Sequence, residues 1–195
     1  NWIKEHIDIP ESVTIDEIVD KLTKASVEVD GINRIGEWWE PGLIQVGLVK
    51  EIMPHPNADR LRLADIELAK SETQRVVCGA PNLAIGQKIV FAKTGSKVYS
   101  PKTNGFITLE TAKIRGVESS GMVLSESELG ISDNHEGILV LDDKYDVGTS
   151  AQSILADTIL DVHIWPNRPD LMNIIGIARE IDAIFNAKST LTLPD

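Results

Sequence analysis

Apolar residues recur with two different periods along this chain, and each period predicts one kind of element. Near the start, four of them follow at helical spacing: Ile15, Ile18, Val19 and Leu22. They come directly after Thr14 and Glu17, whose separation matches a capping box, in which two side chains satisfy free N–H groups at a helix start. We therefore predict a helix over residues 15–25. The apolar residues of 27–32 then predict a strand that is broken near Gly31.

From residue 43 onward the period changes to two, which is typical of half-buried strands. Ile44, Val46 and Leu48 show this alternation first. Similar runs predict further strands at 60–68, 74–78, 88–92, 106–114 and 137–141. About five short strands at even spacing, separated by proline, glycine and asparagine, predict a small β-barrel. The stretch 36–42 is interpreted as a linker or a domain boundary, and 125–129 as a short helix.

The last part of the chain returns to mixed structure. Polar and apolar residues alternate over 158–164, as in a strand with one solvent-exposed face. Residues 165–170 contain two prolines, which predict a stiff turn. Asp170 is placed to cap a helix that runs through the apolar residues of 171–185. We expect both ends of the chain to be α plus β, with an all-β piece between them.

These elements predict an α+β protein in which one discontinuous domain is interrupted by a five-stranded barrel. We place the first part of the α+β domain at 1–42, the barrel at 43–149 and the second part of the α+β domain at 150–195. The chain begins with Asn1 rather than methionine, so we expect it to be a piece of a longer protein.

Composition narrows the class of protein. The chain has 195 residues and a single cysteine, Cys78, so an internal disulfide is excluded and a reducing compartment is expected. No apolar run approaches the roughly 20 residues that a membrane span needs, and no signal segment opens the chain. We expect a cytoplasmic protein without a membrane partner.

Charge is uneven along the chain, which carries −11 overall. Residues 60–115 hold ten basic and four acidic side chains, whereas 116–149 hold one basic and eight acidic ones. An acidic chain therefore contains one cationic segment, and we interpret it as a surface for the phosphates of RNA. The candidate phosphate-binding residues are Arg60, Arg62, Lys88, Lys93, Lys97, Lys102, Lys113 and Arg115. The alternative is that these cations are ordinary solvent-side residues of half-buried strands.

Catalytic and metal-binding residues are harder to find. His55 and Asp59, with Asp133 and His135, have the chemistry of metal ligands, but their spacing completes no known shell, and shaping a turn explains the first pair better. Cys78 lies in an apolar run, which favours a small buried thiol over a nucleophile. None of the common nucleotide-binding or hydrolase motifs occurs in the sequence. We therefore predict no catalytic residue, metal site or cofactor in this chain.

The central part resembles the tRNA-binding oligonucleotide-fold (OB-fold) domain. The resemblance rests on three stretches: His55-Pro56-Asn57-Ala58-Asp59-Arg60-Leu61, Val77-Cys78-Gly79-Ala80-Pro81-Asn82, and Ile114-Arg115-Gly116-Val117-Glu118-Ser119-Ser120-Gly121-Met122 with Ser125-Glu126 after it. Through the last stretch, the resemblance implies Ser125 and Glu126 as further tRNA-binding candidates. The domain occurs in several kinds of protein, so it does not fix the family alone.

The flanking segments make the resemblance more specific. Pro166-Asn167-Arg168-Pro169-Asp170 and Gly176-Ile177-Ala178-Arg179-Glu180 are similar to the N-terminal region of bacterial phenylalanyl-tRNA synthetase β subunits. This resemblance implies an α2β2 ligase that attaches phenylalanine to its tRNA with ATP and Mg²⁺. It also implies that the aminoacylation site and the editing site both lie outside this chain. It implies tRNA and the α subunit as partners, and not DNA. Two alternatives stay open: a module that mainly docks subunits or domains, and a stand-alone tRNA-binding protein.

Overall fold

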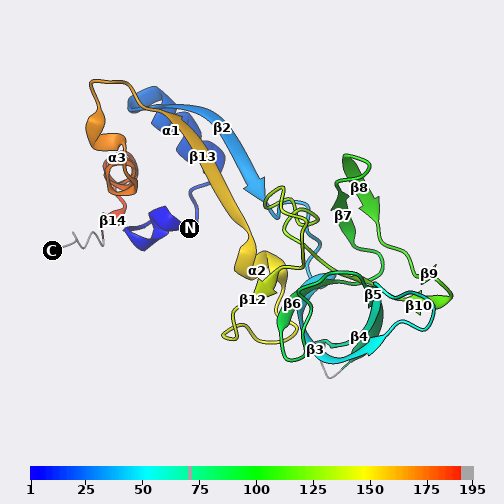
Figure 1. The fold of residues 1–195 in the computed structure, drawn as a ribbon. Helices are drawn as coiled ribbons and strands as arrows, with labels where there is room; N and C mark the ends of the chain where they lie inside the picture. Colours follow the sequence, from blue (N-terminus) through cyan, green and yellow to red (C-terminus); the bar gives the residue numbers. More distant parts are fainter. Residues whose placement is uncertain (70–71, 190–195) are drawn as a thin grey trace. The chain divides into compact units, whose positions relative to one another are not determined.

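A computed structural model describes residues 1–69 and 72–189, and these residues fall into two compact units (Figure 1). One unit contains residues 1–34 and the described residues from 157 onward, and the other contains residues 35–156. Strands predominate over helices. Within the described part, no helix is long and apolar enough to cross a membrane. The predicted domain boundaries stay predictions, and the last six residues of the third segment lie outside the described range.

The predicted five-stranded barrel is confirmed as a nearly closed antiparallel barrel. Its strands, in spatial order, are β11 (Met122–Val123), β6 (Lys88–Ala92), β3 (Ile44–Pro54), β4 (Arg62–Glu67) and β5 (Thr73–Cys78). Two hydrogen bonds join β5 to the segment before β11: Val77 N–H donates to Ser119 Oγ at 3.1 Å, and Ser120 N–H donates to the Arg75 carbonyl at 3.3 Å. These bonds bring the two edges of the sheet together.

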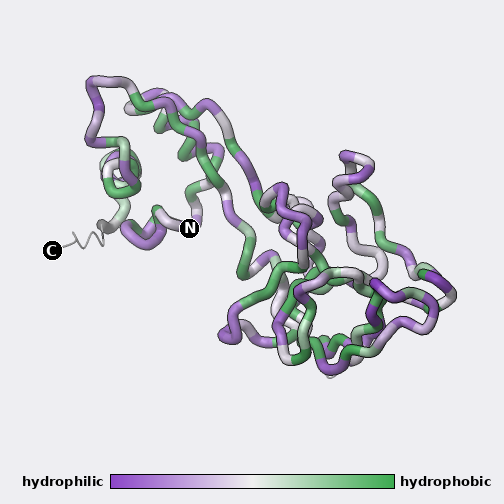
Figure 2. Tube along the Cα trace, in the orientation of Figure 1, coloured by the Kyte–Doolittle hydropathy of each residue, from purple (hydrophilic) through white to green (hydrophobic). Residues whose placement is uncertain are grey.

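Strand β6 and the first half of β3, residues 44–49, are covered on both faces, and Figure 2 shows how apolar positions gather along the barrel strands. Ile89 and Phe91 of β6 are fully buried in the barrel interior, beside Val49 and Ile66. The interior also contains Cys78, and burial raises the pKa of its thiol, so the prediction of a small buried thiol is confirmed. The run 89–92 is therefore continuously apolar, because neither face of this part of β6 meets water.

The outer face of β3 and β6 is covered by the second apolar cluster. Val46 and Val90 lie there with Trp39, which is only 2% exposed and donates its indole N–H to the Leu129 carbonyl at 3.2 Å. The segment 36–42 is therefore not a free linker, because it supplies a core side chain, whereas the division between the two compact units does lie close to it, after residue 34. Trp39 had no periodic apolar neighbours in the sequence, and a pattern-based prediction had no signal for its burial.

Among the described residues, this unit also contains two hairpins and two small elements. They are β7 (Lys97–Ser100) with β8 (Gly105–Thr108), β9 (Ala112–Ile114) with β10 (Val117–Ser119), β12 (Val140–Leu141), and the short helix α2 (Ala151–Leu155). The predicted single strand over 106–114 is thus two strands of different hairpins. The predicted helix over 125–129 is wrong, because this segment is a turn.

The other unit packs two helices against short strands. It contains the 3₁₀ turn Trp2–Glu5, β1 (Ile7–Asp8), α1 (Ile15–Ala25), β2 (Glu28–Ile35), β13 (Asp157–His163), the 3₁₀ turn Pro169–Leu171, α3 (Ile174–Phe185) and β14 (Lys188–Ser189). β1 pairs with β14 and β2 with β13. Helix α1 has the predicted bounds, and Thr14 Oγ1 caps it by accepting from Glu17 N–H at 3.2 Å. The predicted break near Gly31 is wrong, because β2 runs through it.

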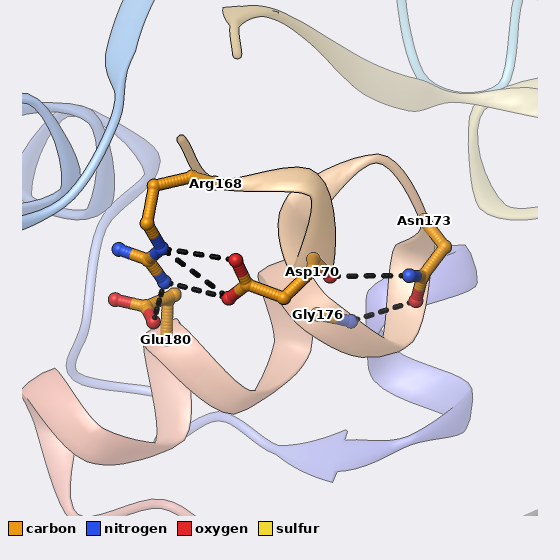
Figure 3. A network of polar contacts seen from close by, with 5 residues as sticks. All are labelled: Arg168, Asp170, Asn173, Gly176 and Glu180. Atoms are coloured by element: carbon orange, nitrogen blue, oxygen red, sulfur yellow. Dashed lines mark hydrogen bonds and ion pairs between the residues drawn. The ribbon is translucent and has the colours of Figure 1, made fainter. Parts of the chain in front are cut away.

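Figure 3 shows the turn that begins α3. Arg168 donates to both oxygens of Asp170 and, at 2.6 Å, to Glu180, so its guanidinium joins the turn to the helix. The helix cap is Asn173 rather than the predicted Asp170, with Asn173 Oδ1 accepting from Gly176 N–H at 2.9 Å. A Cβ at Gly176 would lie 1.9 Å from the Asp170 carbonyl oxygen, so only glycine fits where the turn crosses the helix start.

Asn173 gives the first testable prediction. We expect Asn173→Ala to lower the free energy of unfolding by about 1 kcal/mol, because the first turn of α3 loses its capping oxygen. Asn173→Ser retains such an oxygen and is the matched control, with an expected loss of a few tenths of a kcal/mol. Urea unfolding followed by the helical circular dichroism signal measures both, and equal losses in the two variants would contradict the assignment of the cap.

A cross-strand ion pair predicts how barrel stability depends on pH. Arg75 on β5 donates from Nε and Nη2 to the two oxygens of Asp65 on β4, each at 2.7 Å, and these bonds lower the pKa of Asp65 below 3.8. A carboxyl group with a lowered folded pKa contributes stability above its unfolded pKa. That contribution is complete above about pH 5 and is lost as the pH falls through the folded value.

We therefore expect Asp65→Asn to lose less stability than the unmodified chain when the pH falls from about 6 to about 3. Urea unfolding at a series of pH values measures the difference. Glu110→Gln is the matched control, because Glu110 is an exposed carboxylate with no cation partner among the described residues. If the free energy of unfolding fell equally with pH in Asp65→Asn and in the unmodified chain, the pair would not act in this way.

Candidate nucleic-acid interface

Two of the sequence motifs, separated by more than fifty residues, are held together by His55. Its side chain is 6% exposed and lies in the loop between β3 and β4. Nδ1 accepts from the N–H of Asn57 at 3.1 Å, so Nε2 carries the hydrogen and donates to the Ile114 carbonyl at 3.1 Å. A neutral imidazole is therefore fully paired at this place, which assigns His55 a structural role.

Asn57 adds a second bond between the same segments. Its Nδ2 donates at 3.0 Å to the carbonyl of Arg115, at the tip of the β9–β10 hairpin. Ile114 and Val117 are register partners, so Arg115 and Gly116 form a two-residue loop, with φ of 51° and 90°. Positive φ at both positions is the type I′ geometry that suits a right-twisted hairpin. The hydrogen bonds of His55 and Asn57 thus form a clasp that fixes the position of this turn.

The clasp joins the loop that carries Arg60 to the hairpin that carries Lys113 and Arg115. Figure 1 shows this hairpin, β9–β10, beside the barrel. Arg60 belongs to the loop that carries His55, and Lys113 and Arg115 belong to the clasped hairpin. All three are exposed, and none forms an ion pair within the described residues. Glu118 lies opposite Lys113 in the β9–β10 pairing, so one acidic side chain is close to this lysine. We refer to Arg60, Lys113 and Arg115 as the basic corner.

Two further predicted cations lie on the β7–β8 hairpin. Lys97 and Lys102 are both exposed, and neither has an anionic partner in the described part of the chain. Lys97 Nζ lies 4.5 Å from the centre of the Phe106 ring, a cation–π contact. This hairpin is a second place where unneutralised positive charge meets solvent.

Three other predicted cations are held by intramolecular bonds. Arg62 donates to the carbonyls of Ala80 and Leu83, the latter at 3.0 Å. Lys88 Nζ donates to the carbonyls of Asp143 and Tyr145 at 2.6 and 2.5 Å. Lys93 Nζ lies 3.2 Å from a carboxylate oxygen of Glu72. These side chains stabilise loops around the barrel.

Arg60 also differs from its expected position. The alternation with Leu61 and Leu63 placed Arg60 and Arg62 on one strand face, but β4 begins at Arg62 and Arg60 lies in the preceding turn. The two guanidinium groups therefore do not share a strand face. Strand spacing alone gave no sign that Arg62 would meet two backbone carbonyls.

Ser125 and Glu126 lie in the turn that follows β11. Ser125 is 6% exposed, and its Oγ and N–H donate to Glu128 at 2.8 and 2.7 Å. Glu126 accepts from the Ser132 hydroxyl at 2.6 Å. The bonds that the structure gives both residues are internal to this loop, and they are not part of the basic corner.

The candidate metal ligands are not gathered. His135 is exposed and bonds at 3.1 Å to the Asp133 carbonyl, whereas His55 belongs to the clasp. Across residues 1–69 and 72–189, no group of three or more His, Cys, Asp or Glu side chains is arranged to hold a metal. A hollow of about 540 Å³ is lined by residues 52–55, 58–59 and 61–62, and none of the three residues of the basic corner lines it.

Comparison with known families gives one match over more than half of the chain. Residues 44–150 match the model described as "Putative tRNA binding domain". That range includes the barrel, the clasp and every candidate cation.

Relatives match over the entire chain. It is 41% identical over 194 residues to a phenylalanine–tRNA ligase β subunit of Dehalococcoides mccartyi, covering 100% of this chain and 23% of that protein. A β subunit from Salinibacter ruber is 38% identical over 206 residues, covering 100% of this chain and 24% of the relative. The chain thus spans about a quarter of the length of these curated relatives. A MetRS related protein from Pyrococcus horikoshii aligns with a TM-score of 0.38 and 20% identity, covering 54% of this chain and 85% of that one.

The clasp predicts a stability effect. We expect His55→Ala to lower the free energy of unfolding of the barrel by about 1–3 kcal/mol, because the Asn57 N–H and the Ile114 carbonyl lose their partner. His135→Ala is the matched control, since the same truncation at an exposed histidine should cost less than about 0.5 kcal/mol. Urea unfolding measures both changes, and similar values for the two variants would argue against the clasp.

Proposed function

Because the chain belongs to the tRNA-binding domain family, we propose that it is the tRNA-binding N-terminal region of the β subunit of a phenylalanine–tRNA ligase. The observation that carries the RNA role is the basic corner, where Arg60, Lys113 and Arg115 are exposed on two segments joined by hydrogen bonds. Fixed cations of this kind attract phosphates without reading the base sequence.

The ligase assignment is supported by similarity that extends beyond the barrel. The Arg168 turn and helix α3 lie outside residues 44–150, and both lie within the part of the chain that matches the ligase β subunits. In this proposal the complete enzyme joins phenylalanine to its tRNA with ATP and Mg²⁺, in the cytoplasm, as an α2β2 assembly. No residue of this chain is assigned to ATP, Mg²⁺ or a catalytic step.

We also propose the interrupted arrangement of domains. Residues 1–42 and 150–195 would form one α+β domain, and 43–149 an OB-fold barrel. The compact unit at 35–156 supports a division of this kind, since the segments on either side of it belong to one unit.

A docking role is the second candidate, and exposed apolar side chains favour it. Trp2 is 73% exposed, Met172 76% and Trp165 54%, all in the unit built from the two ends of the chain. Large apolar side chains in water are frequent at protein interfaces. We propose that this unit contacts other parts of the ligase, such as the α subunit, while the barrel contacts tRNA.

A salt titration tests the RNA role. We expect the chain to bind phenylalanine tRNA at low salt, with the logarithm of the affinity falling linearly as the logarithm of the salt concentration rises. Replacing Arg60, Lys113 and Arg115 by alanine should weaken binding and make the slope shallower by about 0.7–0.9 for each phosphate that a cation no longer neutralises. Fluorescence anisotropy of labelled tRNA between about 50 and 200 mM salt measures both quantities.

Lys50→Ala is the matched control, because it removes one exposed lysine that already pairs with Glu67 at 2.9 Å. It should leave the slope nearly unchanged. The same variants in the complete ligase separate the two candidates: unchanged tRNA affinity and aminoacylation after removal of the basic corner would favour the docking role. Absence of binding at low salt would remove the RNA role.

A further inference from the structure

The β7–β8 hairpin presents aromatic rings and lysines to solvent at the same place. Phe106 is 49% exposed and Ile107 42% exposed, although both side chains are large and apolar. Residues 97–109 contain Lys97 and Lys102 and no acidic side chain. In Figure 2 the apolar part of β8 leads into a hydrophilic tip. A hairpin that combines exposed apolar side chains with lysines, and has no acidic residue of its own, is suited to a ligand that is both flat and anionic.

The pairing of the two strands determines which rings share a face. Tyr99 and Phe106 are register partners, so they lie on the same face as Lys97 and its partner Thr108. Their ring centres are 5.9 Å apart, with the planes at 77°. Val98, the neighbour of Tyr99, is 1% exposed and belongs to the outer apolar cluster. The opposite face of the hairpin is therefore buried at Val98 and exposed at its partner Ile107, and the aromatic face exposes about half of Phe106.

A third ring extends this face. The ring of Trp38 lies 4.9 Å from that of Phe106, at 63°. The hairpin tip is fixed as well, because the Tyr99 hydroxyl bonds to the side-chain oxygen of Asn104, whose φ is 49°. The rings of Trp38 and Tyr99 both meet that of Phe106 edge to face, so they hold the half-exposed Phe106 ring in place. A ring fixed in this way is preorganised for stacking, which reduces the ordering cost of binding.

We propose that Trp38, Tyr99 and Phe106 form a stacking site for unpaired bases of RNA, with Lys97 and Lys102 contacting the adjacent phosphates. The proposal rests on the proposed RNA role and adds the kind of RNA that this part of the chain recognises. A base that stacks on Phe106 replaces the ammonium of Lys97, which lies 4.5 Å above that ring. The displaced ammonium is then available for the phosphate of the same nucleotide. Paired bases cannot use this face, because their own neighbours cover them.

The test compares single-stranded and duplex RNA of equal length, using a labelled oligoadenylate and a labelled self-complementary duplex at low salt. We expect Phe106→Leu to weaken single-strand binding by roughly 5- to 150-fold, the range for removal of one stacked base. Duplex affinity should change less than about twofold, and the salt slope should stay the same, because no cation is removed. Ile107→Ala, which truncates an exposed apolar residue on the other face of the same strand, should leave both affinities unchanged.

A second measurement needs no change at the stacking ring. Single-stranded RNA should quench the tryptophan emission of the unmodified chain, and the quenching should be largely abolished in Trp38→Phe, which leaves the other three tryptophans in place. Absence of quenching in the unmodified chain, or equal effects of Phe106→Leu on both RNAs, would overturn the stacking site while leaving the basic corner intact. Failure of the unmodified chain to bind either RNA would overturn the proposed function as well. A Phe106→Leu variant that binds single strands normally would instead favour a protein partner for this hairpin.

Discussion

The burial of β6 and of residues 44–49 of β3 on both faces is the constraint on which the rest of the barrel unit depends. One face of each strand lies against the interior with Phe91, and the other lies under Trp39 and its neighbours. Full burial of a side chain of this size contributes about 2–3 kcal/mol, so two apolar layers meeting at one pair of strands give the barrel a fixed centre. Loops and hairpins that carry the charges are attached around this centre. Their own short strands would not be stable without it.

Charged residues in this unit have two different roles, and their partners distinguish them. Arg62 and Lys88 donate to backbone carbonyls, and in doing so they satisfy acceptors that loops would otherwise leave unpaired. Arg60, Lys113 and Arg115 remain in water at the basic corner. A cation count along the sequence gives both kinds equal weight. Direct contact with a phosphate depends on the second kind, because the donors of Arg62 and Lys88 are already occupied by carbonyl oxygens. Their positive charge still adds to the long-range attraction for a polyanion.

Elements whose stability is local were predictable, and contacts between distant segments were not. The capping box at Thr14 and the helical spacing after it define α1 correctly, and the apolar run of β6 defines that strand. By contrast, the burial of Trp39 and the clasp of His55 depend on residues more than fifty positions away. The candidate site was foreseen as a set of cations, but which of them are available to a ligand depends on these long-range hydrogen bonds. The aromatic face of the β7–β8 hairpin was missed for the same reason, since Trp38 joins it from outside the hairpin.

Two requirements conflict at residue 115, one from the conformation of the turn and one from the charge of the basic corner. Positive φ is unfavourable for arginine and is much better tolerated by asparagine, the usual first residue of such turns. Asparagine at 115 would relax the backbone and retain the carbonyl that Asn57 holds, yet it would remove a cation from the corner. Selection for greater folding stability would therefore favour asparagine at this position, whereas selection for tighter polyanion binding would favour arginine. Arginine at this position is the outcome to expect where charge matters more than conformational ease.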